Sequence, residues 1–393
     1  MNQLAEGKII ERQNKDGSTS YQVVVPYKDN NTGKWRYLWR TTRGKRQAQT
    51  LRTKLLSEVS KGDYTQPSKL TVAAHMADWL NGSVKSTVSP RTAKMYSDIT
   101  RLHIVPVIGT VKLSRLKPQT VQALYSAKLE QGLSPRSVQL IHTTLHKSLS
   151  NAVRLGLISH NPLEAVDIPK VERHEMKTMT EENIKMFLDE ARKRNGGEYY
   201  GVFFCLLFTG LRRNEALALR WTDIDLLGAQ LSVNRTMQFI NNQISFKPPK
   251  TKSSRRQIAL TPATCVMLRL HREAQDAIRD ELDLKPTKDS DLIFCQHDGK
   301  PYSPDVVTRN WIKLVRRCGL DGINLHAARH THASILLKQG VSLKVISERL
   351  GHASIGITAD IYSHITPGMQ KAAAASFDDA VVGISKNISL EIH

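Results

Sequence analysis

The spacing of apolar residues changes along this chain of 393 residues, and each change limits the fold of the segment that follows. Between residues 8 and 41, Val, Ile, Tyr and Trp alternate with polar residues, and Asp-Gly and Asn-Thr-Gly separate the runs. Period-two patterns broken by such turn sequences predict a three-stranded antiparallel sheet. We expect a helix from about Lys45 to Ser60 to cover one face of this sheet.

The next region is helical. Lys61 to Leu70 has the Gly, Pro and polar residues of a linker. Beyond it, apolar residues recur at three- and four-residue spacing. Pro90 and Pro135 each follow a serine, as in a capped first helical turn. The pattern predicts one all-α domain of four helices: Thr71 to Leu80, Arg91 to His103, Lys117 to Gln131 and Pro135 to Leu155.

After a second, charged linker from Ile168 to Lys177, helical and strand patterns alternate. Thr180 is a predicted N-cap, and GVFFCLLFTG a buried helix that ends at Gly210. LSVNRTMQFI and NNQISFKPP predict a hairpin around Asn241 and Asn242, with RRQIALT as its third strand. Helices follow, so we expect a mainly helical, mixed α+β domain. The expected boundaries are 1–62, 70–167 and 178–371, with a tail at 372–393.

The charge of the chain indicates a polyanionic partner. The formal net charge is +21 and the pI is near 9.9, which favours nucleic acid. A basic membrane-surface protein is the alternative, but neither a lysine-rich amphipathic helix nor a lipidation signal is evident. A secretory signal and a run of ~20 apolar residues are both lacking, so we expect a soluble intracellular protein with no membrane partner.

The N-terminal 62 residues hold thirteen Lys or Arg against five Asp or Glu, a net charge of +8 that suggests a compact DNA-binding module. The expected third strand separates its aromatic residues from its cations: Trp35, Tyr37 and Trp39 on one side, Lys34, Arg36 and Arg40 on the other. The three cations are candidate DNA contacts. A hairpin whose basic face is merely solvated is the alternative.

The cysteines give no sign of a metal site or a disulfide framework. Four of them occur singly, without CxxC spacing, so we expect reduced structural residues: Cys205, Cys265, Cys295 and Cys318.

Arg212 follows the predicted buried helix, in TGLRRNE. A guanidinium at the rigid edge of a core suits a fixed phosphate ligand, and Glu215 could orient it. The alternative is a helix-capping arginine with a surface Glu partner.

In HAARHTHAS, His326 and Arg329 share a helix face, so both can reach one phosphate. His326 and His330 also have metal-ligand spacing, but no carboxylate or thiol nearby completes a set, and we expect no metal. His330 and His332 are more typical of packed core histidines.

The segment LGHASIGITADIYSHI supplies the last candidates. We expect Gly351 to end a helix, with His352 just beyond and Tyr362 ten residues on, in a segment that Ser354 can cap. Core packing is the ordinary role of such a tyrosine. Lys250, in the basic loop PPKTKSSRR, could equally belong to a patch that tracks phosphates.

Together, two guanidiniums, an ammonium, two imidazoles and a phenol are what breaking and rejoining a DNA phosphodiester needs without metal or ATP. Their order and surrounding words resemble the tyrosine recombinase family, in particular phage-type integrases, over about residues 65 to 370. The spacings are 38, 76, 23 and 10 residues, along the series Arg212, Lys250, His326 with Arg329, His352 and Tyr362.

One departure stands inside the HxxR box, where the family usually has an acidic residue and a leucine. This chain has Ala327 and Ala328, which could loosen the support of the arginines and lower the activity.

The resemblance implies a chemistry for each residue and requires no cofactor. Tyr362 would attack the phosphorus to give a 3′-phosphotyrosine and a free 5′-hydroxyl. Arg212 and Arg329 would neutralise the non-bridging oxygens, and His352 would add a hydrogen bond. His326 would accept the tyrosine proton. Lys250, which precedes a threonine as in the family, would protonate the leaving oxygen, with Lys252 as the other candidate.

The resemblance also implies an assembly. The sheet module would bind arm sites, the helical domain would bind the core site, and a homotetramer on double-stranded DNA would exchange strands. The tail 372–393 would pack on a neighbouring protomer. An accessory DNA-bending or directionality protein and a location in the bacterial cytoplasm, at the nucleoid when active, are expected. Further candidate DNA contacts are Lys94, Arg101, Lys147, Arg154, Lys252 and Arg255.

Three alternatives share parts of this pattern. A type IB topoisomerase has the same chemistry, a chromosome-dimer resolvase the same core, and a DNA-binding regulator could keep the fold without catalysis. The basic sheet module favours an integrase of a mobile element over a resolvase, while phage and conjugative transposon both stay open as the element.

Overall fold

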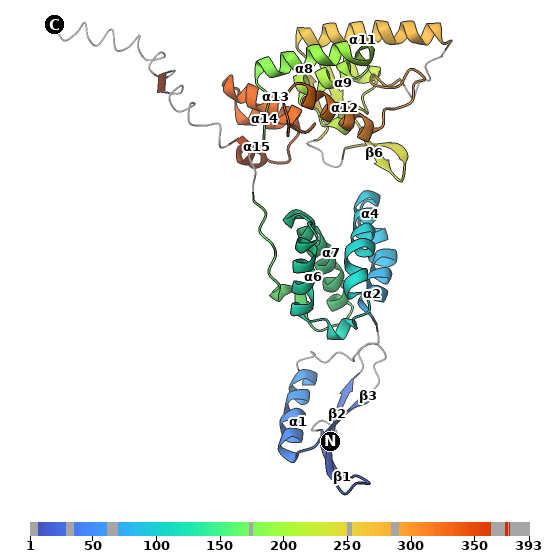
Figure 1. Cartoon of the computed structure of the whole chain (residues 1–393), viewed down its shortest axis with the longest axis vertical. Coiled ribbons are helices and arrows are strands. Elements are labelled where there is room, and N and C mark those ends of the chain that lie inside the picture. The colour runs from blue at the N-terminus through green and yellow to red at the C-terminus, as the bar shows by residue number, and fades with distance from the viewer. Residues whose placement is uncertain are drawn as a thin grey trace, which may run out of the picture. The chain divides into compact units, whose positions relative to one another are not determined.

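The computed structural model describes residues 7–28, 35–60, 70–172, 176–249, 254–283, 291–362, 374–375 and 377 (Figure 1). The chain separates into two compact units, residues 1–173 and 174–393. Several sequence predictions fall outside the described residues: Lys34, Lys250, Lys252, most of the first linker and nearly all of the tail. The described residues form an N-terminal three-stranded sheet, a helical domain and a mixed C-terminal domain.

The N-terminal strands are β1 (Lys8–Gln13), β2 (Thr19–Lys28) and β3 (Trp35–Thr42), which pair antiparallel in the order β1-β2-β3. Helix α1 (Lys45–Ser60) packs on one face, over a core that includes Val23, Val25 and Leu38. Both the sheet and the helix confirm the prediction. We call this unit of β1, β2, β3 and α1 the sheet module.

The two faces of β3 differ as the alternation predicted. Leu38 is buried toward α1, and Arg36 and Arg40 share its side of the strand. Within the described residues of the sheet module no helix packs on the opposite face, and its aromatic side chains are largely exposed. The exposed fractions are 66% for Trp35, 50% for Tyr37 and 51% for Trp39.

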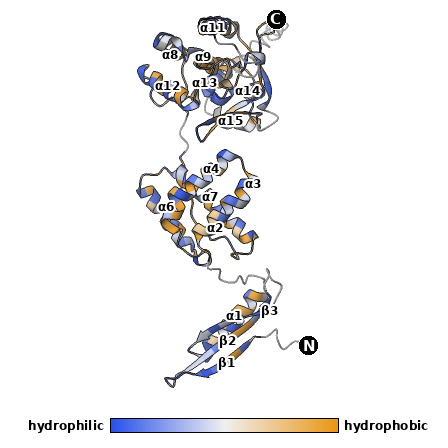
Figure 2. Cartoon of the chain, turned by 90° about the vertical axis from the view of Figure 1, so that its right-hand side faces the viewer, coloured by the Kyte–Doolittle hydropathy of each residue, from blue (hydrophilic) through white to orange (hydrophobic). Residues whose placement is uncertain are grey.

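The helical domain contains the four predicted helices, the first two longer than expected. The first runs from α2 (Val72–Trp79) through a π-helical turn to α3 (Lys85–Thr87), and the second from α4 (Pro90–Ile99) through another π-helical turn to α5 (Val105–Ile108). The others are α6 (Pro118–Glu130) and α7 (Pro135–Arg154). Ser89 and Ser134 cap α4 and α7 as predicted. Apolar stripes on these helices meet in one core (Figure 2).

The C-terminal unit is mainly helical. Its α-helices are α8 (Glu181–Lys193), α9 (Tyr200–Thr209), α10 (Arg213–Ala216), α11 (Pro262–Glu281), α12 (Pro304–Arg317), α13 (Ala327–Lys338), α14 (Leu343–Leu350) and α15 (Ile355–Tyr362). The apolar helix α9 is buried, because α8, α11 and α13 pack around it. Thr180 caps α8, and Gly210 ends α9, as predicted.

The strands of this unit form two sheets rather than the one expected. A hairpin of β6 (Thr236–Ile240) and β7 (Gln243–Lys247) turns at Asn241 and Asn242, both with positive φ, as predicted. The predicted third strand, β8 (Arg256–Ala259), instead pairs with β5 (Gln230–Val233), which also pairs with β4 (Ile224–Asp225). The single sheet was wrong because the expected strand LSVNRTMQFI is interrupted at Asn234 and Arg235, which leaves its two parts, β5 and β6, in different sheets.

The remaining general predictions concern membranes and cysteines. Among the described residues, no helix has the length and apolar character to span a bilayer. Three of the four cysteines are buried, and all four are free thiols.

Candidate active site

Arg212 is placed by the end of α9. Gly210 takes the left-handed conformation there (φ 67°), so the chain leaves the buried helix sharply and Arg212 precedes α10. The Arg212 Nη1 donates to Glu215 Oε1 at 2.8 Å, and the backbone N–H of Arg212 donates to Glu215 Oε2 at 3.0 Å. Glu215 therefore orients Arg212, as the sequence suggested.

Arg329 lies on α13 and is almost fully buried, with 2% of its surface exposed. Its Nη1 donates to the carbonyl oxygen of Gly210 at 2.8 Å, and its Nη2 to that of Leu350 at 2.5 Å. Carbonyl partners hold a guanidinium in place without cancelling its charge. Arg329 therefore joins the end of α9 to the end of α14.

The C-terminal end of α14 collects three arginines. Consecutive carbonyl oxygens accept from Arg256 Nε (Arg349 O, 2.7 Å), from Arg329 Nη2 (Leu350 O, 2.5 Å) and from Arg212 Nη2 (Gly351 O, 3.2 Å). The last carbonyls of a helix lack partners within the helix and carry partial negative charge, which favours cations. Gly351 ends this helix in the left-handed conformation, as predicted, and His352 follows at once.

The surroundings of His352 and His326 favour the neutral form of both rings. Desolvation and the cations Arg329 and Arg212 lower the pKa of His352 to about 4. Desolvation and the same two arginines also lower the pKa of His326. His352 Nδ1 lies 2.8 Å from the hydroxyl of the buried Thr358, which ties it to α15.

Arg212, Arg329, His326 and His352 thus belong to one electrostatically coupled group, although they span 140 residues of sequence. Tyr362 is the last residue of α15, which packs against α14. Its side chain lies outside the described residues, as do Lys250 and Lys252.

Comparison with known proteins decides the family. The model of the phage integrase family matches residues 177–369, and that of the phage integrase N-terminal SAM-like domain matches residues 71–129. The ICEBs1 integrase of Bacillus subtilis (strain 168) is 30% identical over 321 residues, which cover 81% of this chain and 78% of that protein. The chain belongs to the phage integrase family.

Other relatives agree with this assignment. A XerC-like tyrosine recombinase of Caldanaerobacter subterraneus is 28% identical to this chain over 387 residues, which cover 94% of this chain and 98% of that protein. The Tn1549 transposon integrase in complex with a circular intermediate DNA shares the fold, with a TM-score of 0.68 at 19% identity, over 78% of this chain and 99% of that one. The integrase is a site-specific tyrosine recombinase, and the relatives do not favour the topoisomerase or regulator alternatives.

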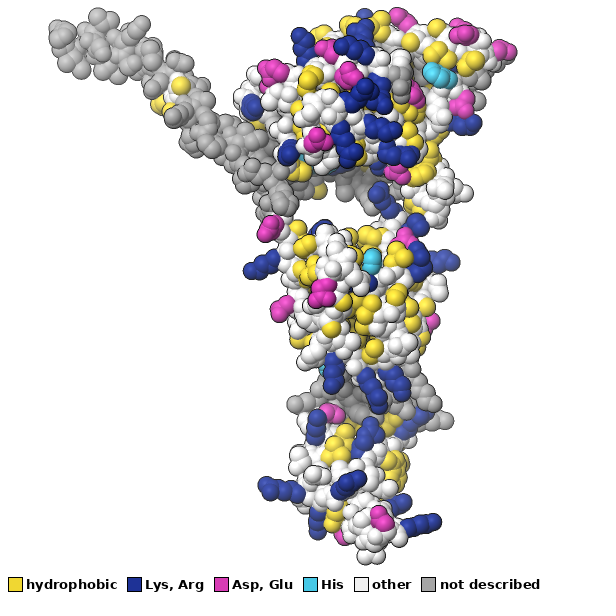
Figure 3. All heavy atoms as spheres, in the orientation of Figure 1, with side chains coloured by type: hydrophobic (Ala, Val, Ile, Leu, Met, Phe, Trp, Pro, Cys, Tyr) yellow, Lys and Arg dark blue, Asp and Glu magenta, His cyan; other side chains and the backbone are white. Residues whose placement is uncertain are grey.

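The candidate DNA contacts of the helical domain lie on its surface. Lys94 and Arg101 both pair with Asp98, at 3.5 and 3.4 Å. The other two are Lys147, whose Nζ donates to Tyr96 Oη at 2.8 Å, and Arg154, which is exposed. In the C-terminal unit Arg255 is also exposed. Lys and Arg side chains are prominent over the surface drawn in Figure 3.

Two arginines of the site were not predicted. Arg256 was taken for part of the basic loop, yet its side chain is only 6% exposed and pairs with Glu215. The strand alternation could have found it, since Arg256 shares a face with the buried Ile258. Arg349 donates to His332 Nε2 at 2.9 Å, so His332 is the hydrogen-bonded core histidine that the sequence suggested.

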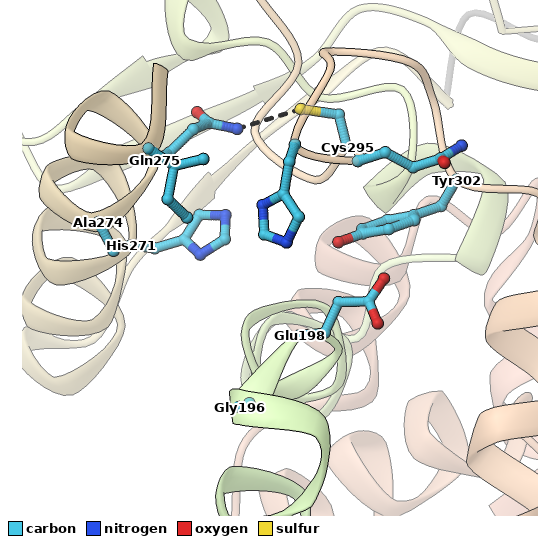
Figure 4. A pocket seen from close by; sticks show the side chains of 11 residues that line it. Gly196, Glu198, His271, Ala274, Gln275, Cys295 and Tyr302 are labelled. Carbon is cyan, nitrogen blue, oxygen red and sulfur yellow. Dashed lines mark hydrogen bonds between the residues drawn. The ribbon is translucent and has the colours of Figure 1, made fainter. Parts of the chain in front are cut away.

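A separate cavity of about 140 Å³ lies beside α11 (Figure 4). Of the predicted catalytic residues that the structure describes, none lines it; its polar side chains include Glu198, His271 and Cys295. Gln275 donates to Cys295 Sγ at 3.1 Å, and burial raises the pKa of that thiol. Cys295 is therefore a poor nucleophile.

Proposed function

We propose that the integrase cleaves and rejoins DNA through Tyr362, with Arg212, Arg329, His326, His352 and Lys250 as its catalytic partners. One observation supports this most strongly. Arg212 and Arg329, far apart in sequence, donate to the consecutive carbonyls of Gly351 and Leu350, directly before His352. This arrangement concentrates positive charge at the start of the segment that leads to Tyr362.

In this mechanism the Tyr362 oxygen attacks the phosphorus while the bond to the 5′-oxygen breaks. His326 takes the phenolic proton, and Lys250 gives a proton to the leaving oxygen. The tyrosine–phosphate bond keeps the energy of the broken ester, so a new 5′-hydroxyl restores the strand without ATP. Preorganised guanidiniums act on the charge that develops at the phosphate oxygens.

The lowered pKa values fit these roles. A neutral His326 can accept a proton, whereas an imidazolium cannot. If the Thr358 hydroxyl donates to Nδ1 of His352, the neutral ring carries its proton on Nε2. That N–H can then donate to a non-bridging phosphate oxygen.

The domains would divide the work of DNA recognition. Residues 1–62 would bind arm sites, residues 70–167 the core site, and residues 178–371 would hold the active site. Strand exchange would require a homotetramer, in which the tail 372–393 packs on a neighbouring protomer. The lambda integrase tetramer bound to a Holliday junction has the same fold, with a TM-score of 0.57 at 18% identity over 92% of this chain and 96% of that one. The product would be integration and excision of a mobile element, inside the bacterial cell.

The arm-binding face of the sheet module is the one opposite α1. Lys8, Arg12 and Lys28 lie on this face, by their register with Val24, Ser20 and Trp35. A hollow of about 260 Å³ on the same face includes Tyr37 and Trp39. Cations around exposed aromatic rings suit phosphate contact together with apolar contact to bases. Arg36 and Arg40, on the α1 side, would then be less important than predicted.

Covalent trapping tests the proposal. The substrate is a duplex carrying the recombined junction of the element, nicked near the cleavage site so that a short fragment diffuses away. The wild-type chain should give a protein–DNA adduct that survives denaturation, and Tyr362→Phe should give none while it still binds the duplex. An adduct of equal yield in Tyr362→Phe would refute the assignment of the nucleophile.

A further inference from the structure

Arg256 connects two segments that carry predicted catalytic residues, the one that begins with Arg212 and the one that leads to His352. It is the first residue of β8, just after the segment that contains Lys250, and its Nη1 donates to Ser254 O at 3.3 Å. Its Nη2 donates to Glu215 Oε2 at 3.0 Å, on the partner of Arg212. Its Nε donates to Arg349 O at the end of α14, three residues before His352.

Glu215 is shared between two guanidiniums. Its side chain is 5% exposed, and it receives Arg212 on Oε1 and Arg256 mainly on Oε2. Burial opposes ionisation, but the two arginines together keep the pKa of Glu215 below its ordinary value. The Glu215 carboxylate is therefore charged, and the group of Arg212, Glu215 and Arg256 carries a net charge of +1.

The exposure of the two arginines indicates how this charge is distributed. The Arg212 side chain is 38% exposed, whereas that of Arg256 is only 6% exposed. A ligand can therefore approach Arg212 but not Arg256. Without Arg256, the negative charge of Glu215 would act on Arg212 alone, at low effective dielectric. The charge of Arg212, which is proposed to bind the phosphate, would then be neutralised by Glu215.

We propose that Arg256 is a positioning residue of strand cleavage, which binds the second oxygen of Glu215 and so keeps the charge of Arg212 available to the scissile phosphate. This inference rests on the proposed function of Arg212. Arg256 itself does not touch the DNA in this arrangement. Its bond to Arg349 O also fixes the end of α14, where Arg212 and Arg329 are bound.

Single-turnover cleavage of the nicked duplex, with the full chain in excess, tests the role of Arg256. Arg256→Met should slow cleavage about 100-fold, the usual size for loss of one preorganised charge contact. Arg256→Lys keeps the charge but not the fork of donors, and should recover about tenfold of that loss. The affinity for the duplex should stay within about twofold, because the change acts on the transition state rather than on binding.

A double variant separates this electrostatic role from simple structural support. If unopposed Glu215 is what disables Arg212, then adding Glu215→Gln to Arg256→Met should speed cleavage at least about fivefold over Arg256→Met alone. A structural role predicts the opposite, since a second change in a buried network would slow cleavage further. A double variant as slow as the single one, or slower, would overturn the proposal.

Arg235→Met is the matched control. Arg235 also pairs with a buried carboxylate, that of Asp223, and within the described residues it has no bond to a predicted catalytic residue. It should lose thermal stability and keep the wild-type cleavage rate. Cleavage at the wild-type rate in Arg256→Met would refute this inference alone, provided that the adduct still depends on Tyr362. Loss of that dependence would instead refute the proposed function.

Discussion

The active site and the sheet module use their cations in opposite ways. In the active site, Arg329 and Arg256 are almost fully buried and bonded to carbonyl or carboxylate oxygens. In the sheet module, Lys8, Arg12 and Lys28 are exposed on the face opposite α1. Fixed charges suit a transition state, since they need no reorganisation when the reaction occurs. Exposed charges suit a grip on phosphates, whose strength comes from released counterions.

This difference predicts that substitutions in the two regions impair different properties of the protein. A change in the active site should reduce the rate and the stability together, because the same hydrogen bonds serve both. A change on the sheet should reduce affinity and its dependence on salt, with the fold intact. Besides Arg256→Met, three experiments would break or sharpen this contrast: a substitution of Arg329, substitutions on the sheet module, and the pH dependence of stability.

The largest effect is expected at Arg329. Arg329→Met should slow cleavage by about 10²- to 10³-fold, because one preorganised charge at the phosphate is lost. It should also destabilise the domain, since each carbonyl left unsatisfied at Gly210 and Leu350 costs about 1–3 kcal/mol. Single-turnover cleavage and thermal denaturation measure the two effects. Arg316→Met, at an arginine whose side chain is 72% exposed and which is not a predicted DNA contact, is the control and should change neither.

A stable Arg329→Met variant that cleaves at the wild-type rate would remove Arg329 from the active site. A destabilised variant with normal cleavage at low temperature would limit it to a structural role.

Much of the site could be predicted from the sequence, since each catalytic candidate lies beside a local signal. Gly210 and Gly351 mark helix ends, as the sequence predicted, and Arg212 and His352 lie within two residues of them. The partners of these residues could not be predicted. That the carbonyls of Leu350 and Gly351 would face two distant arginines depends on tertiary packing, which no local spacing encodes.

The errors have related causes. Arg256 resembled its neighbours in a run of cations, although only strand pairing decides which of them points inward. The single sheet expected for residues 231–259 was also wrong, because the predicted strand LSVNRTMQFI is split into β5, which pairs with β8, and β6, which pairs with β7. The prediction of which residues share a face of β3 was confirmed, but alternation alone does not tell which face a helix covers. In each case the spacing of hydrophobic residues predicted the element, but it did not predict which other element packs or pairs with it.

A smaller effect is expected on the sheet. The double variant Arg12→Gln with Lys28→Gln should lower the slope of log affinity against log salt, for arm-site DNA, by about 0.9 per lost phosphate contact. Arg36→Gln with Arg40→Gln removes the same charge from the side that faces α1. Fluorescence anisotropy at several salt concentrations measures both. Core-site cleavage should be unchanged in either variant.

The comparison of the two pairs decides between the faces. A larger loss of slope from the Arg36 and Arg40 pair would place DNA on the α1 side, as the cation pattern first suggested. Equal losses from both pairs would indicate general attraction without a preferred face.

The smallest effect concerns pH, and it also separates the two regions. Burial and the nearby Arg349 lower the pKa of His332 to about 4 in the folded state, against an ordinary value of 6.5. Between these values the unfolded chain binds the proton and the folded chain does not. The stability is therefore complete above pH 6.5 and decreases as the pH falls toward 4, by about 1.4 kcal/mol per pH unit for one proton. His330 and His352 shift in the same direction.

The sheet module has no such group, because the first histidine of the chain is His75. Hydrogen exchange of the full chain, corrected for intrinsic rates, should show opening of α9 and α13 becoming easier from pH 6.5 to 4. Protection of β2 should change less over the same range. In His332→Asn the slope of the opening free energy of α9 against pH should fall by the contribution of one proton, since asparagine does not titrate. An unchanged slope would mean that His332 is already protonated in the folded chain. The hydrogen bond from Arg349 Nε to His332 Nε2 could then not exist, because an imidazolium nitrogen cannot accept a hydrogen bond.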